Sequence, residues 1–332
     1  MTRSSLAADF GALGYLVRRA LGVFLKDKLS VFLALLSPLI VLVLYIFFLG
    51  DLQTDSLLAY FPAGTVDESA AQAFVDSWMI AGVLGTATIT VSFSANSVMV
   101  GDRERGVLGD FLAAPVKKSV LIGGYFVFNF VVTVVICTVV FLIGLVYLAA
   151  SGSFFMSAAD VFAALGTVLF AALSATLISV LVCAAFPTQG ALGGFAGIVS
   201  AAIGFLIGAY MPLSTFPDGV EYAAGVLPGT HAAGLFRNFF MRGALENLTA
   251  GLPAGVSDEI AESFSMTFGF FGAEADIAVM AGYVAGWIAL TAVLGLVLGT
   301  RLLDLPAGRS RSKKRPAAGG ADEDQAVNGG GK

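Results

Sequence analysis

The stretch Val120–Ala149 reads VLIGGYFVFNFVVTVVICTVVFLIGLVYLA and contains no Asp, Glu, Lys, Arg or His. A helix needs roughly 20 predominantly apolar residues to cross the hydrocarbon core of a bilayer. Val120–Ala149 is longer than that, so it predicts one helix that is tilted or that extends past the bilayer. The pair Gly123-Gly124 is a candidate break near its start.

Five further stretches are equally free of charged residues and long enough to span a membrane. They are Val31–Leu49, Trp78–Val100, Val161–Phe186, Gly190–Tyr210 and Ile277–Thr300. Across the 332 residues, 58% are hydrophobic and only 12% are charged, about half the charged fraction of a soluble domain. The sequence therefore predicts an all-α integral membrane protein with six transmembrane helices.

The second stretch carries a competing signal. From Thr86 to Asn96 a polar residue stands at every second position, which is typical of a β-strand. A transmembrane barrel needs about eight or more such strands, and the other five stretches are continuously apolar. We therefore expect a helix, because Ser and Thr hydroxyls are tolerated where they hydrogen-bond within the helix or to a neighbour.

The charges indicate the orientation. Of the 18 basic residues, all but Arg237 and Arg242 lie in the N-terminal segment, between the second and third spans, or after the sixth. The segments between spans one and two and between spans five and six are acidic. The positive-inside rule then predicts cytoplasmic N- and C-termini, in a multi-pass protein of a bacterial inner membrane.

Three regions follow from this topology: a cytoplasmic N-terminal helix (1–29), a transmembrane domain (30–304) and a disordered cytoplasmic tail (305–332) rich in Gly, Ala and charge. Apolar residues recur every three or four positions between Leu6 and Lys28, which predicts an amphipathic helix at the inner interface; a plain basic flank is the alternative. In the extracellular segment 211–276, the apolar cluster Leu235, Phe236, Phe239, Phe240 and Met241 suggests a partly re-entrant path.

The cytoplasmic loop 101–119 contains GDRERGVLGDFLAAPVKK from Gly101 to Lys118. It is dense in both charge signs and interrupted by Gly and Pro. Leu108, Phe111 and Leu112 form a small apolar face, as in a short helix that contacts a soluble partner. An ordinary solvated loop with a basic anchor is the alternative.

This loop resembles the signature loop of the permease subunits of type-2 ABC exporters. The resemblance rests on Glu104-x-Gly106-x-Leu108, then Leu112-x-x-Pro115 and a basic pair. Two further stretches are similar to the family pattern: Lys26-Asp27-Lys28 before Leu36-Ser37-Pro38, and Met211-Pro212-Leu213, Phe216-Pro217, Leu227-Pro228, Arg237 and Gly243 in order. The resemblance covers about residues 15 to 300; Val107 stands where the family usually has Thr.

The resemblance implies that the N-terminal helix and the loop contact a separate ATP-binding subunit, present in two copies. The residues implied in this coupling are Arg18, Arg19, Arg103, Glu104, Arg105, Gly106, Leu108, Leu112, Pro115, Lys117 and Lys118. The chain itself has no Gly-x-x-x-x-Gly-Lys-Ser/Thr phosphate loop. We therefore expect a non-catalytic subunit that binds no cofactor or metal, with ATP and Mg on its partner.

The family also pairs two permeases, identical or related, around a pathway lined largely by the second and fifth helices. The corresponding side chains are Thr86, Thr90, Phe93, Ser97, Phe195, Val199 and Phe205. They are mostly apolar with weak hydrogen-bonding groups, which suits an amphiphilic or hydrophobic cargo such as a drug, polyketide, peptide or lipid. For each of them, ordinary packing is the alternative.

Small residues on the fifth span allow close helix contact. Gly193 and Gly197, and again Gly204 and Gly208, are four positions apart, and this spacing lets helix backbones approach closely. The contact is either with a second permease across a dimer axis or with another helix of the same chain.

The sequence thus predicts the permease of an ATP-driven exporter, with multidrug resistance as a possible role. The alternatives are an ATP-independent carrier or channel and a membrane anchor or sensor of a cytoplasmic complex. Ion-coupled carriers place ionisable residues inside their helices, and the six predicted spans have none. His231 is the sole histidine and has no catalytic or metal-ligand cluster beside it. Membrane lipid is an expected partner and nucleic acid is not.

Overall fold

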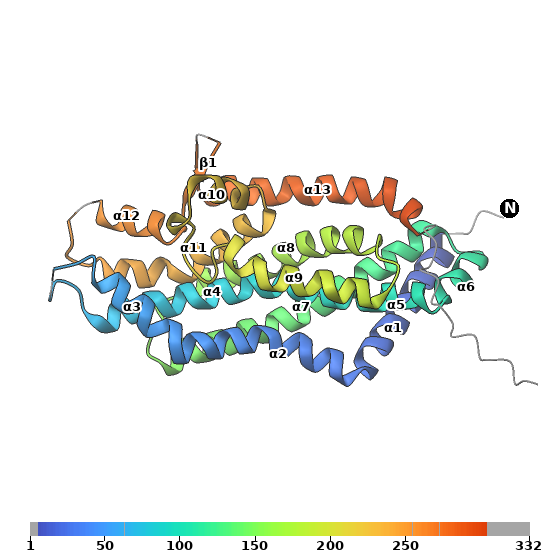
Figure 1. The fold of residues 1–332 in the computed structure, drawn as a ribbon, viewed down its shortest axis with the longest axis horizontal. Coiled ribbons are helices and arrows are strands. Elements are labelled where there is room, and N and C mark those ends of the chain that lie inside the picture. Colours follow the sequence, from blue (N-terminus) through green and yellow to red (C-terminus); the bar gives the residue numbers. More distant parts are fainter. Residues whose placement is uncertain (1–5, 63, 254, 272, 304–332) are drawn as a thin grey trace, which may run out of the picture.

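A computed structural model describes residues 6–303, except 63, 254 and 272. It is an elongated helical bundle with one two-stranded hairpin (Figure 1). The elements are α1 (Leu6–Lys26), α2 (Lys28–Leu44), a π-helical turn (Tyr45–Leu49), α3 (Gly50–Leu58), α4 (Glu68–Ala95), α5 (Ser97–Glu104), α6 (Val107–Ala113), α7 (Lys118–Ala150), α8 (Ala158–Cys183), α9 (Gln189–Leu206), a 3₁₀ turn (Leu213–Thr215), α10 (Asp218–Gly225), α11 (Pro228–Leu248), α12 (Val256–Ser263), β1 (Phe268–Phe270), β2 (Ala273–Ala275) and α13 (Ile277–Leu302). The predicted tail 305–332 lies outside the described residues.

The prediction of an all-α membrane protein is confirmed, with six candidate membrane-spanning helices. Within the part of the chain that the structure describes, six helical segments are long and apolar enough to cross a membrane. The first continues from α2 through the π-helical turn into α3, and the second runs from Glu68 to Glu104 through α4 and α5. Both begin or end well beyond the predicted apolar cores, because helices continue into their polar flanks.

The alternating stretch on α4 is helical, as expected. Its hydroxyl groups donate to carbonyl oxygens about one turn earlier: Thr86 to Val83 at 2.9 Å and Thr90 to Thr86 at 3.1 Å. A buried hydroxyl can satisfy its donor in this way without leaving the helix. Nearly every α4 residue is buried, so α4 is the central helix of the bundle.

The predicted break at Gly123-Gly124 is wrong, because α7 continues through both residues. Gly124 lies where α1 crosses α7, and a Cβ atom there would stand 3.0 Å from the Leu16 Cβ. The missing side chain therefore allows α1 to approach α7 closely, and Leu16, Ala20 and Phe24 of α1 are buried.

The segment between the fifth and sixth spans forms a large part of the core. The helix α11 packs against α4, α8 and α13, and Pro228 at its first turn suits a helix N-terminus. Of the predicted apolar cluster, Leu235, Phe236, Phe240 and Met241 are buried and Phe239 is half-buried. Arg237 and His231 are buried with them, so ionisable groups do lie inside the bundle, although outside the six predicted spans.

Gly243 on α11 gives a prediction about this packing. A Cβ atom at this position would lie 2.0 Å from the backbone oxygen of Phe155, so Gly243→Ala forces two backbones apart. We expect it to lower the free energy of unfolding by about 1–3 kcal/mol, measured as thermal stability in detergent. The matched control is Gly166→Ala on α8, where a Cβ atom has nothing within 4 Å. Equal stability of the two variants would contradict this packing.

Candidate functional site

The two short helices α5 and α6 form a hairpin at one end of the bundle, beside α1 (Figure 1). We call this end the α6 end, and the opposite end, which carries α3 and α12, the α12 end. Gly106 joins the two helices with φ +80°, in the left-handed region that glycine adopts without strain. The predicted signature loop is therefore an ordered helical hairpin.

A buried carboxylate fixes this hairpin to the bundle. Asp102 of α5 is fully buried and accepts hydrogen bonds from both terminal nitrogens of Arg19 on α1, one of them at 2.8 Å. The Tyr125 hydroxyl of α7 donates to the same carboxylate at 2.8 Å, and the Arg105 Nη2 lies 3.6 Å away. The hydrogen bonds that Arg19 donates to the Asp102 carboxylate raise the pKa of Arg19. We call Asp102, Arg19, Tyr125 and Arg105 the Asp102 cluster; it joins α1, α5 and α7.

A second set of contacts joins the hairpin to the α8–α9 connection. Arg103 is buried and donates to the backbone oxygens of Ala184 and Phe186. The Glu104 carboxylate accepts the backbone N–H of Gln189 at 3.0 Å, at the first residue of α9. The Gln189 side-chain amide in turn donates to the backbone oxygen of Ser97 at 3.0 Å. These contacts join α5 to the start of α9.

The predicted coupling residues divide into an outer and an inner set. Arg18, Arg105, Gly106, Pro115, Lys117 and Lys118 are exposed. Arg19, Glu104 and Leu112 are partly buried. Leu108 and Arg103 are buried in the chain itself, so Leu108 anchors α6 to the core instead of presenting an apolar contact. Phe111 carries the Arg19 guanidinium 5.1 Å above its ring centre.

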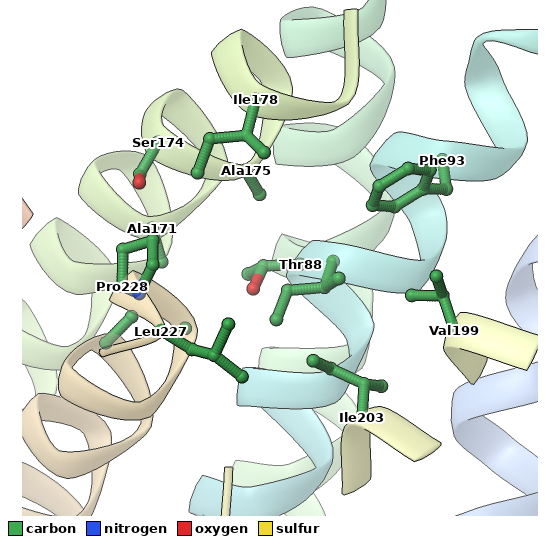
Figure 2. A pocket seen from close by; sticks show the side chains of 13 residues that line it. Thr88, Phe93, Ala171, Ser174, Ala175, Ile178, Val199, Ile203, Leu227 and Pro228 are labelled. Atoms are coloured by element: carbon green, nitrogen blue, oxygen red, sulfur yellow. The ribbon is translucent and has the colours of Figure 1, made fainter. Parts of the chain in front are cut away.

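Two spaces adjoin α9, and some of the predicted pathway residues line them. The α2–α9 groove, about 350 Å³, is lined on one side by Ser30 and Leu33 and on the other by Gln189, Gly193 and Gly197. The α8–α9 cavity, about 190 Å³, lies between α4, α8, α9 and the start of α11 (Figure 2).

The predicted pathway residues lie in different places around these spaces. Phe93 lines both, Ser97 lines the groove, and Val199 lines the cavity. Thr86 and Thr90 are buried and line neither, while Phe205 is 47% exposed and packs on Tyr210. Phe195 packs between Phe93 and Phe186, with ring centroids at 5.7 and 5.1 Å.

The four glycines predicted for close helix contact, Gly193, Gly197, Gly204 and Gly208, also fall into two kinds. A Cβ atom at Gly193 or Gly197 would meet nothing within 4 Å. At Gly204 it would lie 2.2 Å from the Tyr210 ring, and at Gly208, where φ is +70°, 2.9 Å from Leu213. The second pair therefore serves contacts inside the chain, whereas the first pair faces open space.

Two buried polar sites were not singled out from the sequence. The Asp102 carboxylate lies in the signature loop, but its partners Arg19 and Tyr125 are remote in sequence. Asp76 on α4 is buried and accepts hydrogen bonds from Gln72, Tyr147 and Ser153 at 3.0, 3.1 and 2.6 Å.

His231 packs against Phe268, Phe270 and Tyr283, with Nε2 2.8 Å from the Gly225 backbone oxygen. Among the described residues, no group of three or more His, Cys, Asp or Glu could hold a metal ion.

Comparison with known proteins agrees with this arrangement. No functionally described protein matches the chain. The family described as ABC-2 type transporter matches residues 11–241, which include most of α1, the α5–α6 hairpin, α9 and most of α11. The match covers well over half of the 332 residues, so the chain belongs to the ABC-2 type transporter family, as a non-catalytic membrane permease component.

Proposed function

We propose that this permease is the membrane part of an ATP-driven exporter and that two copies of a separate ATP-binding subunit dock on the α6 end. The Asp102 cluster carries this proposal. It joins α1, α5 and α7 beneath an exposed polar surface, while Glu104 connects α5 to α9. A force applied by an ATPase to the hairpin would reach the helices around the α2–α9 groove. ATP and Mg would be bound by the partner.

The charge distribution supports a cytoplasmic α6 end in a bacterial inner membrane. The exposed basic residues Arg18, Lys117 and Lys118 belong to this end. The α12 end carries the acidic residues Asp51 and Asp55 of α3 and Asp258 and Glu259 of α12. By the positive-inside rule this distribution supports cytoplasmic termini, with 1–29 as an N-terminal region, 30–304 as the transmembrane domain and 305–332 as a tail.

The helix α1 suits a place at the membrane interface. One side of it, with Leu16, Ala20 and Phe24, is buried, while Leu6, Phe10 and Tyr15 are exposed. Apolar side chains that no described part of the chain covers, on a helix that also exposes Arg18, fit the boundary between head groups and acyl chains.

Segment 211–276 suits a partly re-entrant path on the extracellular side. The helix α9 ends at Leu206, and α11 begins at Pro228 beside Thr88, inside the second span. The chain between them therefore reaches into the bundle before α11 runs out towards the α12 end.

The α2–α9 groove favours an amphiphilic cargo. Its walls combine the hydroxyl and amide side chains of Ser94, Ser97, Ser200 and Gln189 with leucine and phenylalanine. An amphiphilic drug, polyketide, peptide or lipid matches such a surface, and drug export would give multidrug resistance. The open positions Gly193 and Gly197 support pairing of α9 with a second permease, either another copy or a related chain.

Charge reversal at the α6 end tests the docking surface. We expect Arg18→Glu with Lys118→Glu to reduce co-purification of an ATP-binding subunit and its ATPase activity in the complex several-fold, because the surface would change sign. Glu259→Lys, an exposed charge reversal on α12, is the control and should leave both unchanged. If no ATP-binding subunit co-purifies with the unmodified chain, the proposal is wrong.

The same preparation separates the alternatives. Transport in vesicles driven by a proton gradient without ATP would identify an ATP-independent carrier. ATP hydrolysis by the complex without movement of any amphiphile would identify an anchor or sensor.

A further inference from the structure

The helices α8 and α9 follow each other in the chain but do not pack side by side. The helix α9 lies mainly against α4 and α5, and the α8–α9 cavity occupies the space between α9 and α8 (Figure 2). Ala171, Ala175 and Ile178 of α8 face Val199 and Ile203 of α9 across this space, and Leu227 forms the third side.

The wall of this cavity is almost wholly hydrocarbon. Its lining side chains include no charged residue among those described, and the only polar ones are Thr88 and Ser174. The Thr88 hydroxyl already donates to the Gly85 oxygen at 2.8 Å. An apolar cavity of roughly 150 Å³ stays dry and binds benzene, so a cavity of about 190 Å³ accommodates a short length of hydrocarbon and disfavours water.

The depth of the cavity restricts its occupant further. Thr88 lies well inside the second span, and Ser174 and Ala175 lie near the middle of the fourth. The neighbouring surfaces of α8 and α13 carry large exposed apolar side chains, among them Phe162, Leu169, Leu290 and Val293. In a membrane, acyl chains surround these surfaces, and a polar head group cannot reach this depth without a large cost.

We propose that the α8–α9 cavity binds the terminal part of one acyl tail of a membrane phospholipid, which completes the packing between α8 and α9. The site is separate from the groove of the proposed function: the Phe93 ring lies between the two spaces and packs on Phe195. In this proposal the tail is a bound component of the bundle and not the exported cargo, although Val199 of the predicted pathway also lines the cavity.

Photo-crosslinking tests the site with the full chain in phosphatidylcholine vesicles. The probe is phosphatidylcholine with a diazirine at the end of one acyl chain, and adducts are mapped by mass spectrometry. We expect adducts at Ile178, Ile203 and Leu227, besides the surface adducts at Val293 and Val297 of α13. Ala175→Leu should fill the cavity and reduce the cavity adducts several-fold, without changing those on α13.

Two further variants make the test decisive. Ala171→Leu fills the same space from another position and should have the same effect if Ala175→Leu fails to fold. Ala163→Leu adds the same volume on α8 outside the cavity wall and should leave all adducts unchanged. Cavity adducts that persist in both filled variants, or surface adducts alone in the unmodified chain, would overturn the proposal.

A second arm distinguishes a lipid from a cargo. Unlabelled vesicles receive a free diazirine-bearing fatty alcohol instead of the labelled lipid. If this amphiphile labels the cavity and the labelled phospholipid does not, the space belongs to the cargo and the lipid proposal is wrong. Because no ATP-binding subunit is needed, the result does not depend on whether the exporter proposal holds.

Discussion

Replacing Asp102 with Asn is expected to lower the free energy of unfolding by about 2–4 kcal/mol, because the amide carries no charge opposite Arg19 and keeps only one oxygen that can accept a hydrogen bond. The carboxylate is fully buried, whereas Arg19 retains 25% exposure and Arg105 retains 55%. The partial exposure of the arginines keeps the expected loss below that of a wholly buried ion pair. The Tyr125 hydroxyl, buried at 4% exposure, loses its charged acceptor as well.

Thermal unfolding in detergent measures this loss, and Asp110→Asn is the matched control. Asp110 belongs to the same hairpin but is exposed, so its replacement should change stability by less than about 0.5 kcal/mol. A double-mutant cycle with Arg19→Gln isolates the pair, and we expect a coupling energy of about 1–3 kcal/mol. If the two substitutions changed the free energy of unfolding additively, the interaction between Arg19 and Asp102 would contribute nothing to stability.

Asp102→Asn should also affect activity if the exporter proposal is right. The hairpin would lose its attachment to α1 and α7, so ATP hydrolysis in the complex would continue with less transport per ATP. A variant that is less stable but keeps its ratio of transport to hydrolysis would show that the Asp102 cluster has a structural role only.

The six spans could be predicted because each is a local property of the sequence. Burial in a bilayer requires about 20 consecutive apolar residues, and Val120–Ala149 or Ile277–Thr300 meet that condition without reference to any other part of the chain. The predicted ends of the spans were less accurate. The apolar core of the second span begins at Trp78, but the helix begins at Glu68 because Asp76 finds partners on α7 and in the connection that follows it.

The contacts at the site could be predicted only in part, because they join residues far apart in sequence. The loop containing Asp102 was identified from its motif, but nothing local pairs Asp102 with Arg19, 83 positions away. The glycine pairs illustrate the same limit. Gly193 and Gly204 each stand four positions before another glycine, yet only the space beside Gly204 is occupied, by the Tyr210 ring. Which partner fills a space is decided by tertiary packing.

The helix α11 is the clearest example. Its sequence contains Arg237, Asn238 and Arg242, too polar for a continuous apolar span, so the sequence suggested only a partly re-entrant segment. Arg237 is nevertheless fully buried, because carbonyl groups from two other segments accept hydrogen bonds from its two terminal nitrogens. A buried arginine of this kind is recognised only after those carbonyls are placed around it.

Replacing Arg237 with Met is expected to produce the largest loss of stability of any change considered, about 3–5 kcal/mol, because it leaves several buried carbonyl oxygens without a donor. Arg237 donates to the oxygens of Ile207 and Gly208, both at 2.7 Å, and to that of Ser265 at 3.3 Å. The first two lie just after α9, where a helix ends with unpaired carbonyls. Met keeps the length of the side chain but cannot donate.

Arg242→Met is a control on the same helix with the same change of residue. The Arg242 side chain is 48% exposed and its ion pair with Asp160 spans 3.5 Å, so we expect a loss of at most about 1 kcal/mol. Thermal unfolding of both variants in one detergent gives the comparison. Because Arg237 holds the end of α9 against α11, partial proteolysis of Arg237→Met should also cut first between Leu206 and Pro228. Equal losses in the two variants, or a first cut elsewhere, would mean that this buried arginine does not fix the end of α9.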